Sequence, residues 1–143
     1  MRVNEVMTQK PECILPDATI QEAAGRMKEL NVGSMPVCEG DRLVGMITDR
    51  DIATRSTAAG KDPSAEHVRS AMTPGIVYVF EDEDTAEVAK LMGEKQIRRL
   101  PVLNREKRLV GIVSLGDLAV ETRDKRATSE ALKDISKPAA PKR

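Results

Sequence analysis

The chain has 143 residues, of which 23 are basic and 23 acidic, so its formal net charge is zero. A balanced charge gives no general attraction to nucleic acids or anionic membranes, and we expect neither as a partner. The sequence has no apolar run of membrane-spanning length and no basic-then-apolar leader, which predicts a cytoplasmic protein. With one Tyr, one Phe and no Trp, its core must consist of aliphatic side chains.

The sequence repeats itself. Leu43–Ile52 (LVGMITDRDI) is matched in the second half of the chain by Leu109–Leu118 (LVGIVSLGDL), and Val6–Thr8 is matched by Ala71–Thr73. The offset between the copies grows by one in the polar segment Asn104–Arg108, where an insertion is easily accommodated. Self-similarity of this kind predicts two copies of one structural unit. Units of roughly 60 residues are marginally stable alone, so we expect the copies to pack together.

The first half predicts a strand, a helix, a hairpin and a second helix. The expected ranges are Glu12–Leu15, Ile20–Leu30, Met35–Cys38 with Leu43–Thr48, and Thr48 to about Gly60. Apolar residues recur at helical spacing from Ile20, and Asp17 or Thr19 is suited to cap this helix.

The second half predicts the same β-α-β-β-α order. It starts with a strand at Val77–Phe80, its first helix is capped by Asp84 or Thr85, and its last helix runs from Ser114 to about Arg123. The acidic run Glu81–Asp84 precedes a helix, which favours a helix N-terminus over a metal site.

We therefore expect an α/β fold of the α+β sandwich type. Residues 1–65 and 66–126 would form two repeats that pack with pseudo-twofold symmetry. Lys61–Ser70 is the linker, and residues 127–143 are a C-terminal extension. A short helix is expected over Ser129–Ile135, with disorder in the last eight or so residues.

Two cysteines, Cys13 and Cys38, lie in predicted strands of the first half. Two interpretations of these cysteines stay open: they are reduced thiols that act as small core residues, or they form a disulfide between adjacent strands. With a single histidine, His67, and no third cysteine, a structural zinc site is poorly supported.

Each half carries Leu-Val-Gly, two apolar residues, then Thr or Ser, and Asp three residues later, all after an apolar-Pro-Val strand. Two such copies in register resemble the cystathionine-β-synthase (CBS) domain pair, or Bateman module, over about residues 3–123. In particular, the Thr-Asp-Arg-Asp-Ile segment of the first half looks like that of the small stand-alone bacterial CBS-pair proteins. The resemblance implies that the two repeats stack through their sheets and leave two clefts between them, each suited to a ligand that contains adenosine.

The resemblance also implies roles for matching positions. Asp51 and Asp117 would bind the ribose hydroxyls, and Thr48 and Ser114 the ribose or phosphate. Arg98 and Arg99 would face phosphates. The residues expected around the base are Ile14, Pro36, Tyr78, Val79 and Pro101.

The two predicted sites are unequal, because the first half has Gly33 and Ser34 where the second has the two arginines. Both Thr48-x-x-Asp51 and Ser114-x-x-Asp117 also have the form of a capping box, so capping alone stays an alternative to ligand contact.

Other residues have structural explanations. Gly45 and Gly111 are best explained by close backbone packing of the halves. Arg105, Lys107 and Arg108 are expected on a solvated turn, and His67 on the surface.

The sequence contains no nucleophile–base pair, metal cage or Walker-type phosphate loop. We therefore expect a regulatory binding module rather than an enzyme, a homodimer that requires no cofactor and passes a signal to a separate effector protein. The candidate regulatory ligands are AMP, ADP, ATP and S-adenosylmethionine. The alternative is a dimeric structural or interaction protein whose clefts are vestigial.

Overall fold

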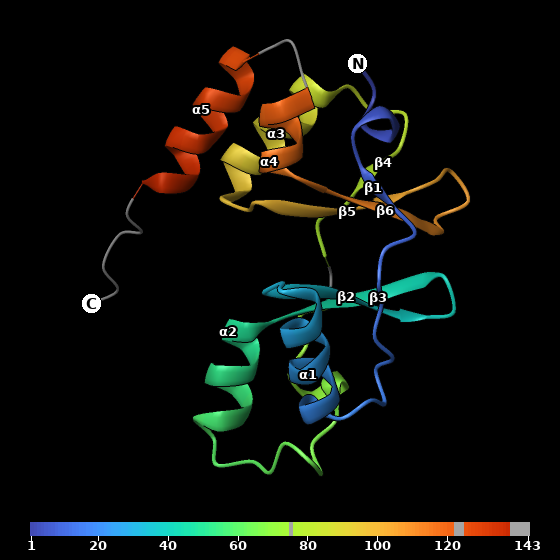
Figure 1. The fold of residues 1–143 in the computed structure, drawn as a ribbon, viewed down its shortest axis with the longest axis vertical. Coiled ribbons are helices and arrows are strands. Elements are labelled where there is room, and N and C mark those ends of the chain that lie inside the picture. The colour runs from blue at the N-terminus through green and yellow to red at the C-terminus, as the bar shows by residue number, and fades with distance from the viewer. Residues whose placement is uncertain (75, 122–124, 138–143) are drawn as a thin grey trace. The chain divides into compact units, whose positions relative to one another are not determined.

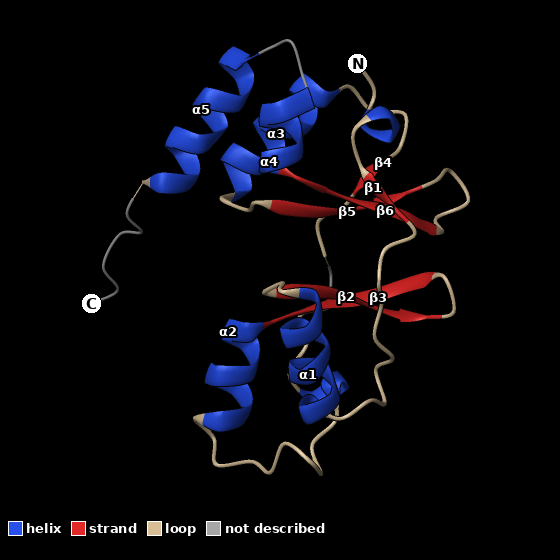
Figure 2. Ribbon diagram, viewed as in Figure 1, coloured by secondary structure: helices blue, strands red, loops and turns tan. Residues whose placement is uncertain are grey.

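The computed structural model describes residues 1–74, 76–121 and 125–137. The chain forms two compact units, one of residues 11–76 and the other of residues 1–10 together with residues 77–143. Each unit contains a sheet covered on one face by helices, so both are α+β folds (Figures 1 and 2). No helix among the described residues has the length and apolarity to cross a bilayer.

The unit of residues 11–76 contains the first repeat. The helix α1 (Ile20–Leu30) precedes the antiparallel hairpin of β2 (Ser34–Glu39) and β3 (Arg42–Thr48). The hairpin continues into α2 (Asp49–Asp51) and a π-helical turn over Ile52–Thr57. Both α1 and α2 lie on the same face of the hairpin (Figure 2).

The other unit contains the second repeat. Its sheet has the order β1-β6-β5-β4, formed by β1 (Thr8–Gln9), β6 (Leu109–Ser114), β5 (Arg99–Leu103) and β4 (Val79–Phe80). Helices cover one face of this sheet (Figure 1). They are α3 (Thr85–Lys95), α4 (Leu115–Glu121) and α5 (Lys125–Ser136).

The repeats exchange their leading segments. Val3, in a 3-10 turn at the start of the first repeat, is fully buried in the core of the second. Val68, its equivalent at the start of the second repeat, is fully buried in the core of the first. Backbone hydrogen bonds hold both segments, Val3 N to Glu83 O at 2.9 Å and Val68 N to Ala18 O at 2.8 Å. The compact units thus divide the chain differently from the repeats in the sequence.

This exchange explains the two strand glycines. A Cβ on Gly111 would lie 2.9 Å from Thr8 O, and one on Gly45 would lie 3.0 Å from Thr73 O. The leading segment of each repeat therefore lies directly against the strand glycine of the other repeat, and only a residue without a side chain leaves room for its backbone. The predicted close backbone approach at both glycines is confirmed, and the approaching backbone is the leading segment of the other repeat.

Most predicted elements are present, with the following differences. The strand predicted at Val77–Phe80 is limited to Val79–Phe80, and the predicted linker Lys61–Ser70 ends in a 3-10 turn over Val68–Ser70 in which Val68 is a core residue. Glu12–Leu15 forms a single bridge, Ile14 to Val37, instead of a strand. The helix after Thr48 is partly π-helical, and the C-terminal helix starts at Lys125 and is longer than predicted. The expected disorder of the tail lies outside the described residues from 138 onward, and so does the end of the helix predicted to reach Arg123.

Candidate ligand site

In the second repeat, β6 ends at Ser114 and α4 begins directly after it. Ser114 Oγ accepts a hydrogen bond from Asp117 N, and Ser114 N donates to Asp117 Oδ2, both at 3.0 Å. This is the reciprocal capping box that Ser-x-x-Asp predicts, since each side chain satisfies a backbone N–H that the helix start leaves unpaired.

The first repeat has the same arrangement. Thr48 Oγ1 accepts from Asp51 N and Thr48 N donates to Asp51 Oδ2, again at 3.0 Å. In both repeats one carboxylate oxygen is used by the cap. An ionised carboxylate offers about four lone-pair sites, so each Asp keeps capacity for further hydrogen bonds.

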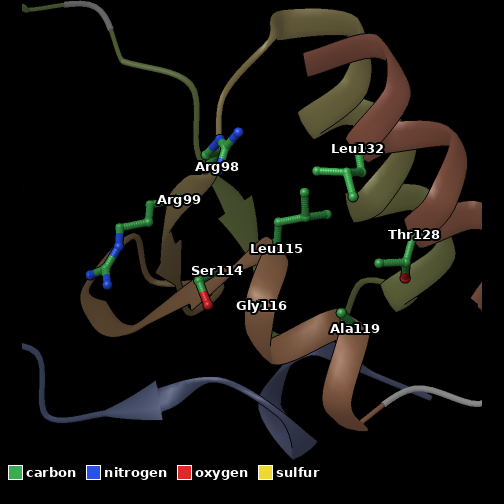
Figure 3. Close-up of a pocket in the computed structure, with 8 residues that line it drawn as sticks. All are labelled: Arg98, Arg99, Ser114, Leu115, Gly116, Ala119, Thr128 and Leu132. Carbon is green, nitrogen blue, oxygen red and sulfur yellow. The ribbon is translucent and has the colours of Figure 1, made fainter. Parts of the chain in front are cut away.

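A pocket of about 290 Å³ lies beside the Ser114 cap (Figure 3). It is formed by residues at the start of β5, the end of β6, the first turns of α4 and one face of α5. The residues that line it are Arg98, Arg99, Ser114, Leu115, Gly116, Ala119, Thr128 and Leu132.

Arg98 is positioned by the backbone, because its carbonyl accepts a hydrogen bond of 2.8 Å from Leu115 N. This bond joins the start of β5 to the start of α4. Arg98 and Arg99 are both exposed, and their side chains point in different directions (Figure 3). Adjacent residues at the start of a strand diverge in this way because successive side chains alternate between faces.

The floor of the pocket is apolar. Leu115 from α4 and Leu132 from α5 point toward each other across it (Figure 3). Leu132 is 48% exposed, so the apolar part of the pocket reaches the protein surface. Thr128 and Leu132 were not predicted as site residues. The sequence indicated a C-terminal helix but gave no signal for which face it presents to α4.

The equivalent place in the first repeat has a different charge. Asp49 N donates to Gly33 O at 2.9 Å, in the same way that Leu115 N donates to Arg98 O. An acidic side chain therefore stands where the second repeat has a leucine, and a Cβ on Gly33 would lie 3.0 Å from Asp49 Oδ2. A carboxylate at this position disfavours a phosphate, so the two places differ in electrostatics as well as in shape.

The residues predicted to surround the base are mostly core residues. Ile14 and Val79 are 7% and 1% exposed, and Pro36 and Pro101 are buried in strand pairs. Tyr78 is the exception, with 36% exposure and an edge-to-face contact to Phe80 at 5.6 Å between centroids. None of the five lines the pocket beside Ser114. Their contact with a base stays a prediction.

Arg105 has a structural role that the sequence did not indicate. Its guanidinium donates to both carboxylate oxygens of Asp82, at 2.8 and 3.0 Å, and covers the ring of Phe80 at 4.2 Å. The ion pair lowers the pKa of Asp82 and raises that of Arg105. The acidic run is thus used within the fold: Asp82 pairs with Arg105, and Asp84 caps α3 by accepting from Ala86 N. Among the described residues, no cluster of His, Cys, Asp or Glu is suited to hold a metal ion.

The remaining candidates lie in the unit of residues 11–76. His67 is exposed and its Nδ1 lies 2.9 Å from Asp17 O, which confirms its prediction as a surface residue. Cys13 and Cys38 are both free thiols with their sulfur atoms 3.2 Å apart.

Comparison with known proteins identifies the family. Residues 3–57 and 68–122 each match the CBS domain, so the chain belongs to the CBS domain family and contains a tandem CBS pair. This is a family of regulatory modules. Among its relatives is the CBS domain-containing protein YhcV of Bacillus subtilis (strain 168), which is 43% identical over 134 residues, or 94% of each chain.

Solved structures share the fold. The crystal structure of Hypoxic Response Protein I with two coordinated zinc ions superposes with a TM-score of 0.79 at 36% identity, over 85% of this chain and 99% of that one. The CBS domain pair of protein MJ0100, in complex with 5′-methylthioadenosine and S-adenosyl-L-methionine, superposes with a TM-score of 0.73 at 30% identity, over 83% of this chain and 93% of that one. The predictions of the CBS family and of the α+β repeat architecture are confirmed.

Proposed function

We propose that this protein is a sensor of an adenosyl compound, and that its second repeat binds the ligand more tightly than its first. The observation that supports the proposal is the pocket beside Ser114, which is lined by Ser114, two arginines and apolar side chains of α4 and α5. Asp117 does not line this pocket but is held next to it by its capping hydrogen bonds with Ser114. The complex of the related MJ0100 pair with two adenosyl ligands supports this ligand class.

Each part of a nucleotide has a suitable partner in the second repeat. Asp117 would accept hydrogen bonds from the vicinal hydroxyls of ribose, because its carboxylate keeps free lone pairs after capping. The Ser114 hydroxyl accepts from Asp117 N and keeps its own proton to donate to a ribose or phosphate oxygen. Arg98 and Arg99 would supply charge-assisted hydrogen bonds to a phosphate.

The proposed role of the protein is regulatory rather than catalytic. Binding would shift the population of conformations by the difference in ligand affinity between them, and a separate effector protein would respond to that shift. We further propose that the protein acts as a homodimer in the cytoplasm, where adenine nucleotides are abundant. No cofactor is required in this scheme.

A thermal-denaturation series tests the proposal. AMP, ADP, ATP, S-adenosylmethionine and 5′-methylthioadenosine would each be added to the purified protein, with guanosine as a nucleoside control. A ligand present at a hundred times its Kd stabilises the folded state by about 2.7 kcal/mol. We expect at least one adenosyl compound to raise Tm while guanosine does not.

The competing candidate is a structural or interaction protein with no ligand. Its support is that Ser114 and Asp117 already satisfy each other, and such a cap contributes on the order of 1 kcal/mol without any ligand. An unchanged Tm with every adenosyl compound would favour this alternative and contradict the sensor.

A further inference from the structure

The two cysteines form a pair at the edge of the first repeat. The Cys38 thiol donates a hydrogen bond to Cys13 Sγ at 3.2 Å. Cys38 is buried in β2 and Cys13 is half-buried in the segment that precedes α1. They are the only cysteines in the sequence, so no third thiol competes for either.

The backbone holds this pair in place. Ile14 N donates to Pro36 O and Cys38 N donates to Ile14 O, both at 3.0 Å. The Cys13 segment is therefore joined to β2 on both sides of Ile14. Because the S–S bond is about 2.05 Å long, a disulfide would require the two sulfur atoms to approach by about 1 Å.

The second repeat lacks such a pair. The residues equivalent to Cys13 and Cys38 in the second copy are Tyr78 and Leu103. Both β2 and β5 change register at this point, between Val37 and Cys38 and between Val102 and Leu103. Leucine occupies the buried position without difficulty, at 4% exposure, so the fold itself does not require a thiol there.

The two thiols differ in reactivity. The hydrogen bond from Cys38 lowers the pKa of Cys13, because it stabilises the thiolate. The same bond and burial raise the pKa of Cys38. Since the thiolate is the nucleophile and Cys13 is the more accessible, these features favour Cys13 as the attacking sulfur and Cys38 as the resolving one.

We propose that Cys13 and Cys38 are a modification site that forms a reversible disulfide when hydrogen peroxide oxidises it. The Cys13 thiolate attacks one peroxide oxygen, so that the S–O bond forms, the O–O bond breaks and the leaving oxygen departs as water after protonation. Cys38 sulfur then attacks the sulfenic acid sulfur, the S–S bond forms, and the S–O bond breaks with release of a second water. Two thiols lose two electrons and one peroxide gains them.

The position of the pair gives the bond a structural effect. The chain passes from one compact unit to the other between Lys10 and Pro11, and Cys13 follows within three residues. A disulfide fixes this crossing segment to β2 covalently. Oxidation would thus restrict the motion of the segment that joins residues 1–10 to the rest of the first repeat.

The test uses the full chain, reduced and then treated with one equivalent of hydrogen peroxide. We expect the intact mass to fall by two hydrogen atoms, both thiols to become unreactive to alkylation, and dithiothreitol to reverse both changes. Hydrogen exchange at the amides of Ile14 and Cys38 is expected to slow in the oxidised form. Disulfide-linked dimers, or a monomer that keeps both thiols, would overturn the proposal.

Two single variants identify the attacking sulfur. Cys38→Ser keeps Cys13 and is expected to accumulate a sulfenic acid that a dione probe traps. Cys13→Ser keeps only the buried Cys38 and is expected to gain little label. Equal labelling of the two variants, or stronger labelling of Cys13→Ser, would contradict the assigned roles. Circular dichroism on both variants shows whether they remain folded, and the wild-type mass measurement decides the proposal independently.

Discussion

Val3 belongs to the first repeat in sequence but is fully buried in the core of the second, and Val68 belongs to the second repeat but is fully buried in the core of the first. Each is held by a backbone hydrogen bond to the turn before the first helix of that core, at Glu83 O and Ala18 O. Neither repeat therefore completes its core with its own leading segment. The exchange makes each repeat depend on the other for a complete core.

This dependence predicts similar losses from two distant substitutions. Val3→Ala and Val68→Ala are each expected to lower the free energy of unfolding by about 2 kcal/mol, because each removes buried methyl groups and leaves a cavity. Chemical denaturation measures the effect. Leu15→Ala is the control, since Leu15 is 61% exposed and its truncation should change little. A near-zero effect of Val3→Ala would mean that its segment is not part of the core.

Substitution by alanine is expected to change the free energy of unfolding in opposite directions at a strand glycine and at a helix glycine. Gly111→Ala places a Cβ 2.5 Å from Met7 Sδ and 2.9 Å from Thr8 O, so β1 must shift from β6. We expect a loss of roughly 1–3 kcal/mol. Gly25 lies on α1, and a Cβ added there would meet no heavy atom within 4 Å outside its own helix backbone. Gly25→Ala is therefore expected to stabilise the protein by up to about 1 kcal/mol. Denaturation of both variants checks the contrast, and a stabilising Gly111→Ala would contradict the close contact.

The Asp82–Arg105 pair predicts a dependence on pH. Its hydrogen bonds lower the pKa of Asp82 in the folded state, so the folded protein binds that proton less tightly than the unfolded chain. The stabilisation is therefore complete above the ordinary Asp pKa of about 4 and disappears as pH falls through the lowered value. Asp82→Asn should reduce Tm at neutral pH and have no effect in strong acid. Because the pair is exposed, high salt should also shrink the difference.

Substitution of Arg98 and Arg99 is expected to weaken the binding of ligands that carry phosphate more than that of ligands without it. Replacing both Arg98 and Arg99 with Gln should weaken binding of ATP by roughly tenfold or more, since each hydrogen bond to a charged group contributes about 1.5–3 kcal/mol. Binding of 5′-methylthioadenosine, which has no phosphate, should change little. The two titrations on one variant separate phosphate recognition from damage to the fold. Equal loss for both ligands would contradict the assigned role.

The sequence predicted what local patterns and the repeat determine. The capping boxes at Thr48 and Ser114, the strand glycines and the hairpins follow from spacing and residue type, and the structure has them. The exchange of Val3 and Val68 was not predictable, because equivalent segments carry equivalent patterns and fit either core. Leu132 and Thr128 were missed because their place in the pocket depends on how α5 docks on its neighbours. Arg105 was missed because its partner Asp82 lies on a separate turn.

The most direct test of the account is calorimetric titration of the tightest-binding adenosyl compound into the wild type, Asp51→Ala and Asp117→Ala. We expect two unequal sites in the wild type, loss of the tighter one in Asp117→Ala, and a smaller loss of affinity in Asp51→Ala. Equal losses in the two variants would contradict the inequivalence of the repeats. Full binding in both would contradict the role of the carboxylates.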